Sequence, residues 1–533
     1  MFLKIQKATN KVIVFLNIPK ENLSPLDHLE VTSDFINFNT IKINILDDYL
    51  KYIAIPACSD KELYFYETES EIIFSDCIYE VSDHMEQICE NKSVTDFFLD
   101  MSYTPAGETQ IDGLMRLIPS RIYRLQDGIL YNDKINYVST AYSKEKSDYS
   151  NFISCLKEIC LKESKLGKVG VFFSGGVDSL TLALILESLA IPFTLYTGKM
   201  VQSLDDNEKD VLRSISIAKE RNWELKIIDV DYNEYEFKDL HEIIDLMPTT
   251  SHLSALFLEI AKSMNKDDIK VCFSGQNVDI LYNFEATTSL ALNRGALVNF
   301  ARRFFMSETY FSSLNSKPYK HILVSMVANL FLLGYCLMRK SLDFRLPKSK
   351  EELFHNYTHN PDLTVFSSKI DNNKINEFSY IFEDGEGLRS ALIRSRIEES
   401  LTSGAPMSII NAGIINSVKV ILPYSSELLI PFFMNLKTSV KDILYPKNII
   451  HKFVNTNIKK IAQHNHEPKK NLPNYHTWVD QVFTKTNLGK SLEKLDSKLI
   501  PDTSTSALKL SYQLSYSWKN HLMKSIEKRK NEQ

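Results

Sequence analysis

The sequence predicts an α/β protein in which a β-rich N-terminal domain precedes a doubly wound parallel sheet with a largely helical C-terminal extension. Short runs of β-branched and aromatic residues, broken by polar turns, fill the first part of the chain. Apolar strands then alternate with helical segments of roughly ten or more residues, which is typical of a parallel, doubly wound sheet. Beyond about residue 285, strand signals become rare.

The chain has 533 residues, which is too many for one hydrophobic core. Domains usually hold roughly 100 to 200 residues. Residues 132–150 are polar and have the composition of a linker, which places a boundary near residue 145. We therefore expect an N-terminal domain over residues 1–145 and a second domain over residues 146–533.

Composition and charge favour a cytoplasmic protein that does not act mainly on nucleic acid. Hydrophobic residues make up 44% of the chain and charged residues 24%, and the formal net charge is −5, so there is no basic excess. The closest cysteines among the seven, Cys155 and Cys160, lack a second pair that would complete a zinc site. The first residues lack an apolar segment ending in a cleavage site, so no secretory signal is expected.

Residues 322–338 form an almost uniformly apolar segment. The segment is slightly shorter than the roughly 20 residues that a membrane span needs, and it contains Ser325 and Asn329. We therefore expect a buried helix and no membrane span. A dimer interface, a peptide groove and a membrane surface are three alternatives for its role.

The individual elements follow from these patterns. N-terminal strands are expected over residues 11–18, 42–46, 52–58, 62–68 and 71–81. In the second domain, the period of the apolar residues predicts helices over residues 148–164, 180–189, 206–222 and 254–263. The strands between them are expected over residues 169–173, 193–196, 225–230 and 269–273.

Residues 174–179 (SGGVDS) join a buried strand to a buried helix. Gly175 and Gly176 let the backbone approach a ligand closely and adopt positive φ. The unpaired N–H groups at the start of the helix, with the helix dipole, attract anions, and Ser174 and Ser179 add hydroxyl donors. Because such sheets bind ligands at the carboxyl ends of their strands, the loop predicts a phosphate-binding site.

Asp178 distinguishes this loop from a Walker A sequence, which the chain lacks. A carboxylate next to bound phosphate repels it unless a cation lies between the two. Asp178 therefore predicts a Mg²⁺ ion that bridges the protein to the phosphates. The alternative is a tight turn whose aspartate only interacts with the helix dipole.

The segment FSGGVDS resembles the pyrophosphate-binding loop of the N-type ATP pyrophosphatases. That superfamily includes asparagine, GMP, NAD and argininosuccinate synthetases and some tRNA-thiolating enzymes. The resemblance implies that Mg-ATP is split into AMP and pyrophosphate, mostly with adenylation of a substrate oxygen. It also implies that Ser174, Gly175, Gly176 and Ser179 hold pyrophosphate and that Asp178 binds Mg²⁺.

Further stretches resemble the asparagine synthetase family in particular. In the stretch that begins at residue 196, the resemblance places Tyr196 and Thr197 on the adenine side of the site; a core position is the alternative for Tyr196. Residues 271–284 (VCFSGQNVDILYNF) match a family motif at Ser274, Gly275 and Asp279. Asp279 is thereby implied as a second ligand of Mg²⁺–pyrophosphate, against the alternative of a plain strand-to-helix turn.

Stretches near both ends of the chain extend this resemblance. Residues 421–436 and 445–454 are similar to the family's C-terminal helical region, and Lys447 falls where the family has a lysine facing the phosphates. A cation there stabilises charge that grows on the α-phosphate; a surface lysine is the alternative. Residues 106–128 resemble the end of the family's N-terminal domain, so residues 1–145 are implied to form a degenerate Ntn-type, glutaminase-like domain.

The N-terminal domain departs from the family at its catalytic position. Phe2 stands where glutamine-dependent members have a cysteine, whose thiolate attacks the glutamine amide. The first cysteine of the chain, Cys58, lies in an expected strand. We therefore expect no glutaminase activity.

The second domain departs from the family at its acceptor side. Gln276 occupies the place of an acidic residue and cannot act as a general base, so it joins the catalytic candidates Asp279 and Lys447 as a determinant of what the site accepts. Asn277 replaces a glycine, and Ser425 with its neighbour replaces a Leu-Asp pair. These changes bring aspartate into question as the substrate.

The leading hypothesis is an ATP-dependent, AMP-forming amide-bond ligase that joins a small-molecule or peptide carboxylate to ammonia or an amine. Nitrogen then comes from free ammonia, from a partner glutaminase or from the substrate itself. The last source is that of β-lactam synthetases and lasso-peptide cyclases, so a peptide or natural-product cyclase is an alternative. A tRNA-thiolating or nucleobase-modifying enzyme and a non-catalytic ATP-binding scaffold are further alternatives. A peptide-binding partner or a second copy of the chain could complete the assembly.

Overall fold

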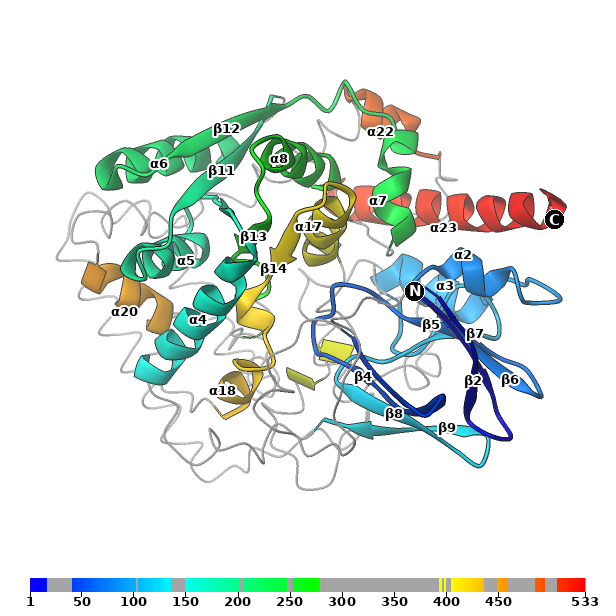
Figure 1. Cartoon of the computed structure of the whole chain (residues 1–533). Coiled ribbons are helices and arrows are strands. Elements are labelled where there is room, and N and C mark those ends of the chain that lie inside the picture. Colours follow the sequence, from blue (N-terminus) through cyan, green and yellow to red (C-terminus); the bar gives the residue numbers. More distant parts are fainter. Residues whose placement is uncertain are drawn as a thin grey trace, which may run out of the picture.

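The computed structural model contains an antiparallel N-terminal sheet, a parallel sheet flanked by helices, and a long C-terminal helix (Figure 1). It describes residues 1–16, 41–101, 104–135, 149–201, 206–246, 251, 253–278, 281, 393–394, 397–398, 404–435, 448–457, 485–493 and 506–532. The expected domain boundary near residue 145 and the apolar segment 322–338 lie outside these residues.

The N-terminal sheet has nine strands in the order β7-β5-β6-β1-β2-β4-β8-β9, with β3 paired to β4. Its strands are β1 (Phe2–Gln6), β2 (Lys11–Leu16), β3 (Lys42–Leu46), β4 (Tyr49–Ile55), β5 (Tyr64–Glu67), β6 (Glu71–Ser75), β7 (Leu114–Arg116), β8 (Arg121–Gln126) and β9 (Ile129–Lys134). Alternate residues of β1, Leu3 and Ile5, are fully buried, and they pack in a core with Ile43, Ile53 and Phe74. The period-two pattern therefore places one face of the sheet on this core.

The structure confirms strands in the five predicted N-terminal runs and corrects the last of them. The expected strand over residues 71–81 ends at Ser75, and residues Ile78–Ser82 form the short helix α2. Ile78, Tyr79 and Val81 are buried on that helix. Their spacing along the chain fits the buried face of a helix as well as it fits a strand, which explains the wrong prediction. Helix α3 (Lys92–Met101) follows α2 in the chain, and strands β1, β7, β8 and β9 were not predicted.

The second sheet is parallel and has the strand order β12-β11-β10-β13-β14. Its strands are β10 (Val169–Phe172), β11 (Phe193–Met200), β12 (Leu225–Val230), β13 (Val271–Ser274) and β14 (Lys419–Ile421). The chain moves outward from β10 to β12 and then returns to the other side of β10 with β13. This reversal is that of a doubly wound sheet, as predicted, and ligands bind where it occurs.

Helices alternate with these strands as the sequence predicts. The predicted helices are α4 (Tyr149–Glu163), α5 (Val177–Ser188), α6 (Asp206–Arg221) and α8 (Ser254–Lys266), and α17 (Gly404–Ile415) is a further helix that was not predicted individually. Helix α5 begins three residues before its predicted start, and its residues Ser179–Leu186 are buried. Strand β14 was missed, because three residues directly after an apolar helix carry too little pattern to register as a strand.

The remaining described elements surround these sheets. They are 3₁₀ turns η4 (Ser164–Leu166), η5 (Phe237–Leu240) and η6 (Pro423–Ser425), and helices α7 (His241–Leu246), α18 (Ile430–Asn435), α20 (Asn448–Asn457), α22 (Asn487–Ser491) and α23 (Ser506–Glu532). Helix α23 packs on α3, where the rings of Phe98 and Trp518 lie 5.1 Å apart. In the part of the chain that the structure covers, no helix is long and apolar enough to span a membrane.

The N-terminal sheet contacts the second domain directly. Glu427 accepts a hydrogen bond from the backbone N–H of Ala57 at 2.5 Å, and Arg121 pairs with Glu398 at 2.8 Å. A single hydrophobic core joins residues of both parts, including Ala57 and Phe152. The structure therefore links the two predicted domains through buried contacts.

Three segments meet at a histidine pair. The rings of His241 in α7 and His521 in α23 stack with centroids 3.6 Å apart. Asp245 lies 2.9 Å from His521 Nε2 and accepts a hydrogen bond from the hydroxyl of Tyr79 at 2.6 Å. Arg529 of α23 lies over the ring of Tyr79. The cluster thus joins the N-terminal domain, α7 and the C-terminal helix.

This cluster predicts loss of stability at mildly acidic pH. Burial, followed by the charge of His521, lowers the pKa of His241 below its ordinary value, against the opposing effect of Asp245 and Asp239. As pH falls below about 6.5, the unfolded chain binds a proton at His241 that the folded chain does not, so the free energy of unfolding decreases. We expect the fall in unfolding temperature between about pH 7 and pH 5.5 to be smaller in His241→Phe than in the wild type.

The substitution His241→Phe keeps an aromatic ring for stacking and removes the titrating group. His84→Phe is the matched control, because the ring of His84 also contacts an aromatic ring, that of Phe2, in a tilted arrangement with centroids 5.4 Å apart. A pH dependence in His241→Phe identical to that of the wild type would contradict the assignment.

Candidate functional site

The SGGVDS loop lies at the carboxyl end of β10, the middle strand of the parallel sheet. Gly175 has φ of +69°. A Cβ atom there would lie 2.9 Å from Ser214 Oγ and 3.1 Å from the Ser214 backbone nitrogen on α6. Glycine is required at this position because of both the backbone conformation and the close approach of α6.

Gly176 caps the start of α5 with extended backbone and no side chain. Glycine has no side chain to cap the first N–H groups of the helix, the groups with which a helix start binds an anion. A Cβ atom on Gly176 would lie 3.2 Å from Ser174 Oγ. The loop thus forms a narrow cradle that a larger residue would partly fill.

The two serines of the loop close it on itself. Ser174 Oγ accepts from the Gly176 N–H, and Ser179 Oγ accepts from the Ser174 N–H, each at 3.3 Å. The two hydroxyl oxygens lie 3.5 Å apart. These distances are at the long end for hydrogen bonds, so the donors can exchange these contacts for the stronger ones that an anion offers.

The second predicted motif lies against the first turn of α5. A Cβ atom on Gly275 would be 2.9 Å from both Asp178 Cβ and the Ser179 backbone nitrogen. Gln276 is half-buried, and its N–H donates to Ser274 Oγ at 3.4 Å. Both loops follow neighbouring parallel strands, β10 and β13, so their side chains meet at one edge of the sheet.

Asn277 follows this turn in a left-handed conformation. Its φ is +72° and its side chain is buried. The sequence comparison with the family predicts glycine here, and asparagine tolerates this backbone region better than most residues do. The replacement of glycine by asparagine therefore keeps the turn.

The side chains of Thr197 and Tyr196, the two residues predicted on the adenine side, point to different ends of the parallel strands. Thr197 is buried, and its hydroxyl donates to the carbonyl of Phe173, next to the loop, at 2.5 Å. Tyr196 is fully buried, and its hydroxyl donates to Asp267, which follows α8 and precedes β13. Asp267 therefore lies towards the amino end of the strands, away from the loop. The side chain of Tyr196 thus lies in the core, which was the alternative for this residue, and its place on the adenine side stays a prediction.

Asp279 and Lys447 lie outside the described residues, so their roles stay predictions. The helix after Lys447, α20, packs against α5, the helix that begins at the loop. Within the described ranges, no group of three or more histidine, cysteine or acidic residues could hold a metal ion. Of the two predicted Mg²⁺ ligands, Asp178 and Asp279, the structure describes Asp178, which is half-buried at the loop.

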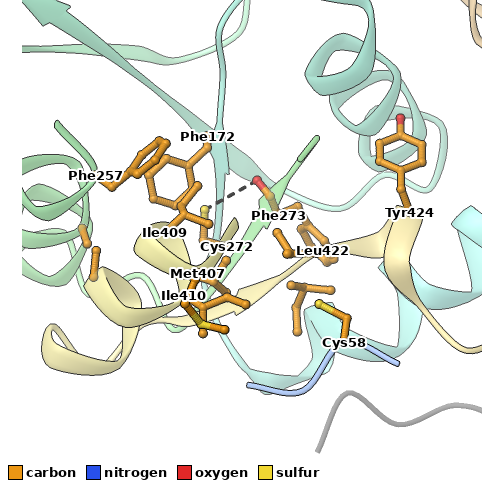
Figure 2. Close-up of a cluster of buried hydrophobic side chains, with 14 of the residues drawn as sticks. Cys58, Phe172, Phe257, Cys272, Phe273, Met407, Ile409, Ile410, Leu422 and Tyr424 are labelled. Atoms are coloured by element: carbon orange, nitrogen blue, oxygen red, sulfur yellow. Dashed lines mark hydrogen bonds between the residues drawn. The ribbon is translucent and has the colours of Figure 1, made fainter. Parts of the chain in front are cut away.

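The cysteines near the site are held in apolar surroundings. Cys272 lies in β13 among Phe172, Phe273 and Met407, with its thiol directed to the Phe273 carbonyl at 3.6 Å (Figure 2). Burial raises the pKa of Cys272 well above its ordinary value. The thiol is consequently protonated at neutral pH and lacks the reactivity that sulfur transfer requires.

Tyr424 is a site residue that sequence reasoning missed. Its hydroxyl donates to the backbone carbonyl of Asp178 at 2.9 Å, across 246 residues of sequence. The resemblance of residues 421–436 to the family indicated this region, but no local pattern indicated a contact with the loop.

The glycine-rich loop lies at the reversal point of a doubly wound parallel sheet, which is where α/β domains of this class bind their ligands. Residues 164–283 of the chain match the family model "Asparagine synthase". This match includes the SGGVDS loop and the second motif. The resemblance to that family is therefore confirmed over these residues.

Two known proteins resemble parts of the chain. A stretch of 232 residues is 28% identical to "Putative asparagine synthetase 1", glutamine-hydrolyzing, of Methanocaldococcus jannaschii. It covers 41% of this chain and 37% of that protein, so well under two thirds of the relative is matched. The U34-tRNA thiolase NcsA from Methanococcus maripaludis aligns at 23% identity over 25% of this chain and 50% of that chain, with a TM-score of 0.17.

Proposed function

We propose that the protein is an ATP-dependent carbon–nitrogen ligase that forms AMP and pyrophosphate. The observation that carries the proposal is the contact between two loops: SGGVDS at the end of β10 and the 274–276 turn at the end of β13 meet at the first turn of α5. Both loops fall within the residues that match the asparagine synthase family. That family typically uses ATP with Mg²⁺.

The residues present fit Mg²⁺–pyrophosphate. Gly175 and Gly176 leave space for the phosphates, and the N–H groups at the start of α5 with the Ser174 and Ser179 hydroxyls would hold their oxygens. Asp178 would hold Mg²⁺, which supplies positive charge to the phosphates. Asp279 and Lys447 are proposed to add a second carboxylate and a cation facing the α-phosphate.

Two steps follow from this arrangement. A substrate carboxylate oxygen attacks the α-phosphorus of ATP, the bond from that phosphorus to the β-phosphate oxygen breaks, and pyrophosphate leaves. An amine or ammonia then attacks the acyl carbon, the carbon–oxygen bond to AMP breaks, and the nitrogen releases a proton. The hydrogen-bond donors of the loop stabilise the charge that moves onto pyrophosphate in the first step.

We also propose that the N-terminal domain has a degenerate glutaminase-like form without glutaminase activity. Phe2 occupies the position of the family's catalytic cysteine. Burial raises the pKa of Cys58 to about 12, and burial also raises that of Cys77, so neither supplies a thiolate nucleophile at neutral pH. Free ammonia, a separate glutaminase or an amine of the substrate would then provide nitrogen.

The residue Gln276 supports a second candidate function, in which the same reaction acts on a substrate other than aspartate. It is half-buried beside the first turn of α5 and presents an amide where the family has an acid. An amide can hold a polar substrate but cannot accept its proton as a base. A cyclase that joins a carboxylate to an amine of the same peptide or natural product fits this change.

The test supplies purified protein with Mg-ATP, ammonia and candidate carboxylates labelled with ¹⁸O, beginning with aspartate and continuing with peptide and metabolite pools. We expect AMP and pyrophosphate only when a carboxylate is present, with ¹⁸O appearing in AMP. Formation of ADP would refute the proposal. ATP binding without turnover in every pool would favour a non-catalytic scaffold.

A further inference from the structure

Tyr424 in η6 contacts the backbone of the residue proposed to bind Mg²⁺. The side chain of Tyr424 is fully buried, and its hydroxyl donates to the Asp178 carbonyl at 2.9 Å. Burial, followed by the charge of Asp178, raises the pKa of Tyr424 well above its ordinary value. The hydroxyl therefore stays protonated and keeps its role as a donor.

The position of Tyr424 is itself fixed from two sides. Its ring stacks on that of Phe152 in α4, with centroids 6.3 Å apart and an interplanar angle of 21°. The same short segment is tied to the N-terminal domain, because Glu427 accepts a hydrogen bond from the Ala57 N–H at 2.5 Å. Because the Tyr424 hydroxyl is held in place by these contacts, it restricts the position of the Asp178 carbonyl to which it donates.

The first turn of α5 is thus contacted from two directions. Tyr424 holds the Asp178 carbonyl, and Gly275 lies so close that a Cβ atom would be 2.9 Å from Asp178 Cβ. We propose that Tyr424 is a positioning residue that fixes this turn so that the Asp178 carboxylate faces the metal. The inference rests on the proposed function, since it concerns how that site holds Mg-ATP.

The experiment compares ATP affinity with Mg²⁺ and with EDTA in the full-length protein, using isothermal titration calorimetry. The variants are Tyr424→Phe, Asp178→Ala and the matched control Tyr64→Phe. Tyr64 is also buried, and its hydroxyl donates to Glu62 at 2.6 Å within the N-terminal sheet. Thermal unfolding of each variant without ligand reports whether the fold is intact.

We expect Tyr424→Phe to weaken Mg-ATP binding about threefold to tenfold, the value of one hydrogen bond, and to weaken ATP binding in EDTA less. Asp178→Ala should remove the Mg²⁺-dependent gain in affinity, and Tyr64→Phe should leave both affinities unchanged. A merely structural loss would lower the unfolding temperature of both tyrosine variants without changing the Mg²⁺-dependent gain.

The outcomes separate this inference from the proposed function. If wild type and Asp178→Ala behave as expected but Tyr424→Phe keeps the full Mg²⁺-dependent gain, the inference is wrong and the proposed function stands. If the wild type does not bind Mg-ATP, or if Asp178→Ala keeps the gain, the proposed function fails at its nucleotide or metal site and the inference fails with it.

Discussion

Asp178→Ala is expected to lower the rate of pyrophosphate release from Mg-ATP by about 100-fold or more, the scale for losing a group that stabilises transition-state charge. Asp178 is half-buried in the first turn of α5, where the N–H groups of the helix face the proposed phosphates. Without its carboxylate, the proposed Mg²⁺ would lose a protein ligand, and with it positive charge next to the pyrophosphate that leaves. A pyrophosphate-coupled assay with the active carboxylate pool measures the effect.

Two further variants make this result specific. Asp178→Asn keeps the shape of the side chain and removes its charge, so its rate of pyrophosphate release should be nearly as low as that of Asp178→Ala. Glu187→Gln neutralises an acid in the last turn of the same helix, where Glu187 contacts Arg221 and Trp223, and it should retain wild-type rates. Activity of Asp178→Asn close to that of the wild type would refute the metal-binding role.

Local sequence was sufficient to predict the strand-to-helix loop over residues 174–179. All of its groups lie within residues 174–179, and the glycines, serines and aspartate have the spacing that a strand-to-helix anion site needs. The alternating strands and helices around it were predicted for the same reason, because each has a period of its own. The positive φ of Gly175 and the extended cap at Gly176 agree with that expectation.

Long-range contacts account for what the sequence did not reveal. Tyr196 and Tyr424 are both aromatic residues in apolar surroundings, and nothing local distinguishes them. The structure directs the hydroxyl of Tyr196 to Asp267 and that of Tyr424 to Asp178. The first contact lies away from the loop and the second lies on it. Only the hydrogen bond from η6 to the first turn of α5 makes this distinction, since the partners are far apart in sequence.

The N-terminal sheet shows a similar limit. Strand β1 was missed although Leu3 and Ile5 alternate as buried residues, because a run of five residues at the chain start is too short to be distinguished from a loop. Its neighbours β2 and β6 provide the pairing that stabilises it. Pairing between strands, rather than the pattern of one strand, therefore determines this part of the fold.

Gly275→Ala is expected to weaken Mg-ATP binding by about tenfold or more, the effect of about 1.4 kcal/mol, and to lower the free energy of unfolding by about 1 to 3 kcal/mol. The new Cβ atom would lie 2.9 Å from Asp178 Cβ and from the Ser179 backbone nitrogen. Backbone cannot yield as the end of a flexible side chain can, so the first turn of α5 must shift. That shift moves both the N–H groups and the carboxylate that the phosphates and metal are proposed to use.

Gly404→Ala supplies the matched control for this variant. Gly404 has φ of +61°, and a Cβ atom there would meet nothing within 4 Å. Its alanine variant should therefore lose about 1 kcal/mol of stability from backbone strain and bind Mg-ATP as the wild type does. Calorimetric titration and chemical unfolding of both variants separate the two effects. If Gly275→Ala lost stability but bound Mg-ATP with wild-type affinity, the 274–276 turn would support the fold alone, and the contact between the two loops would no longer argue for a shared nucleotide site.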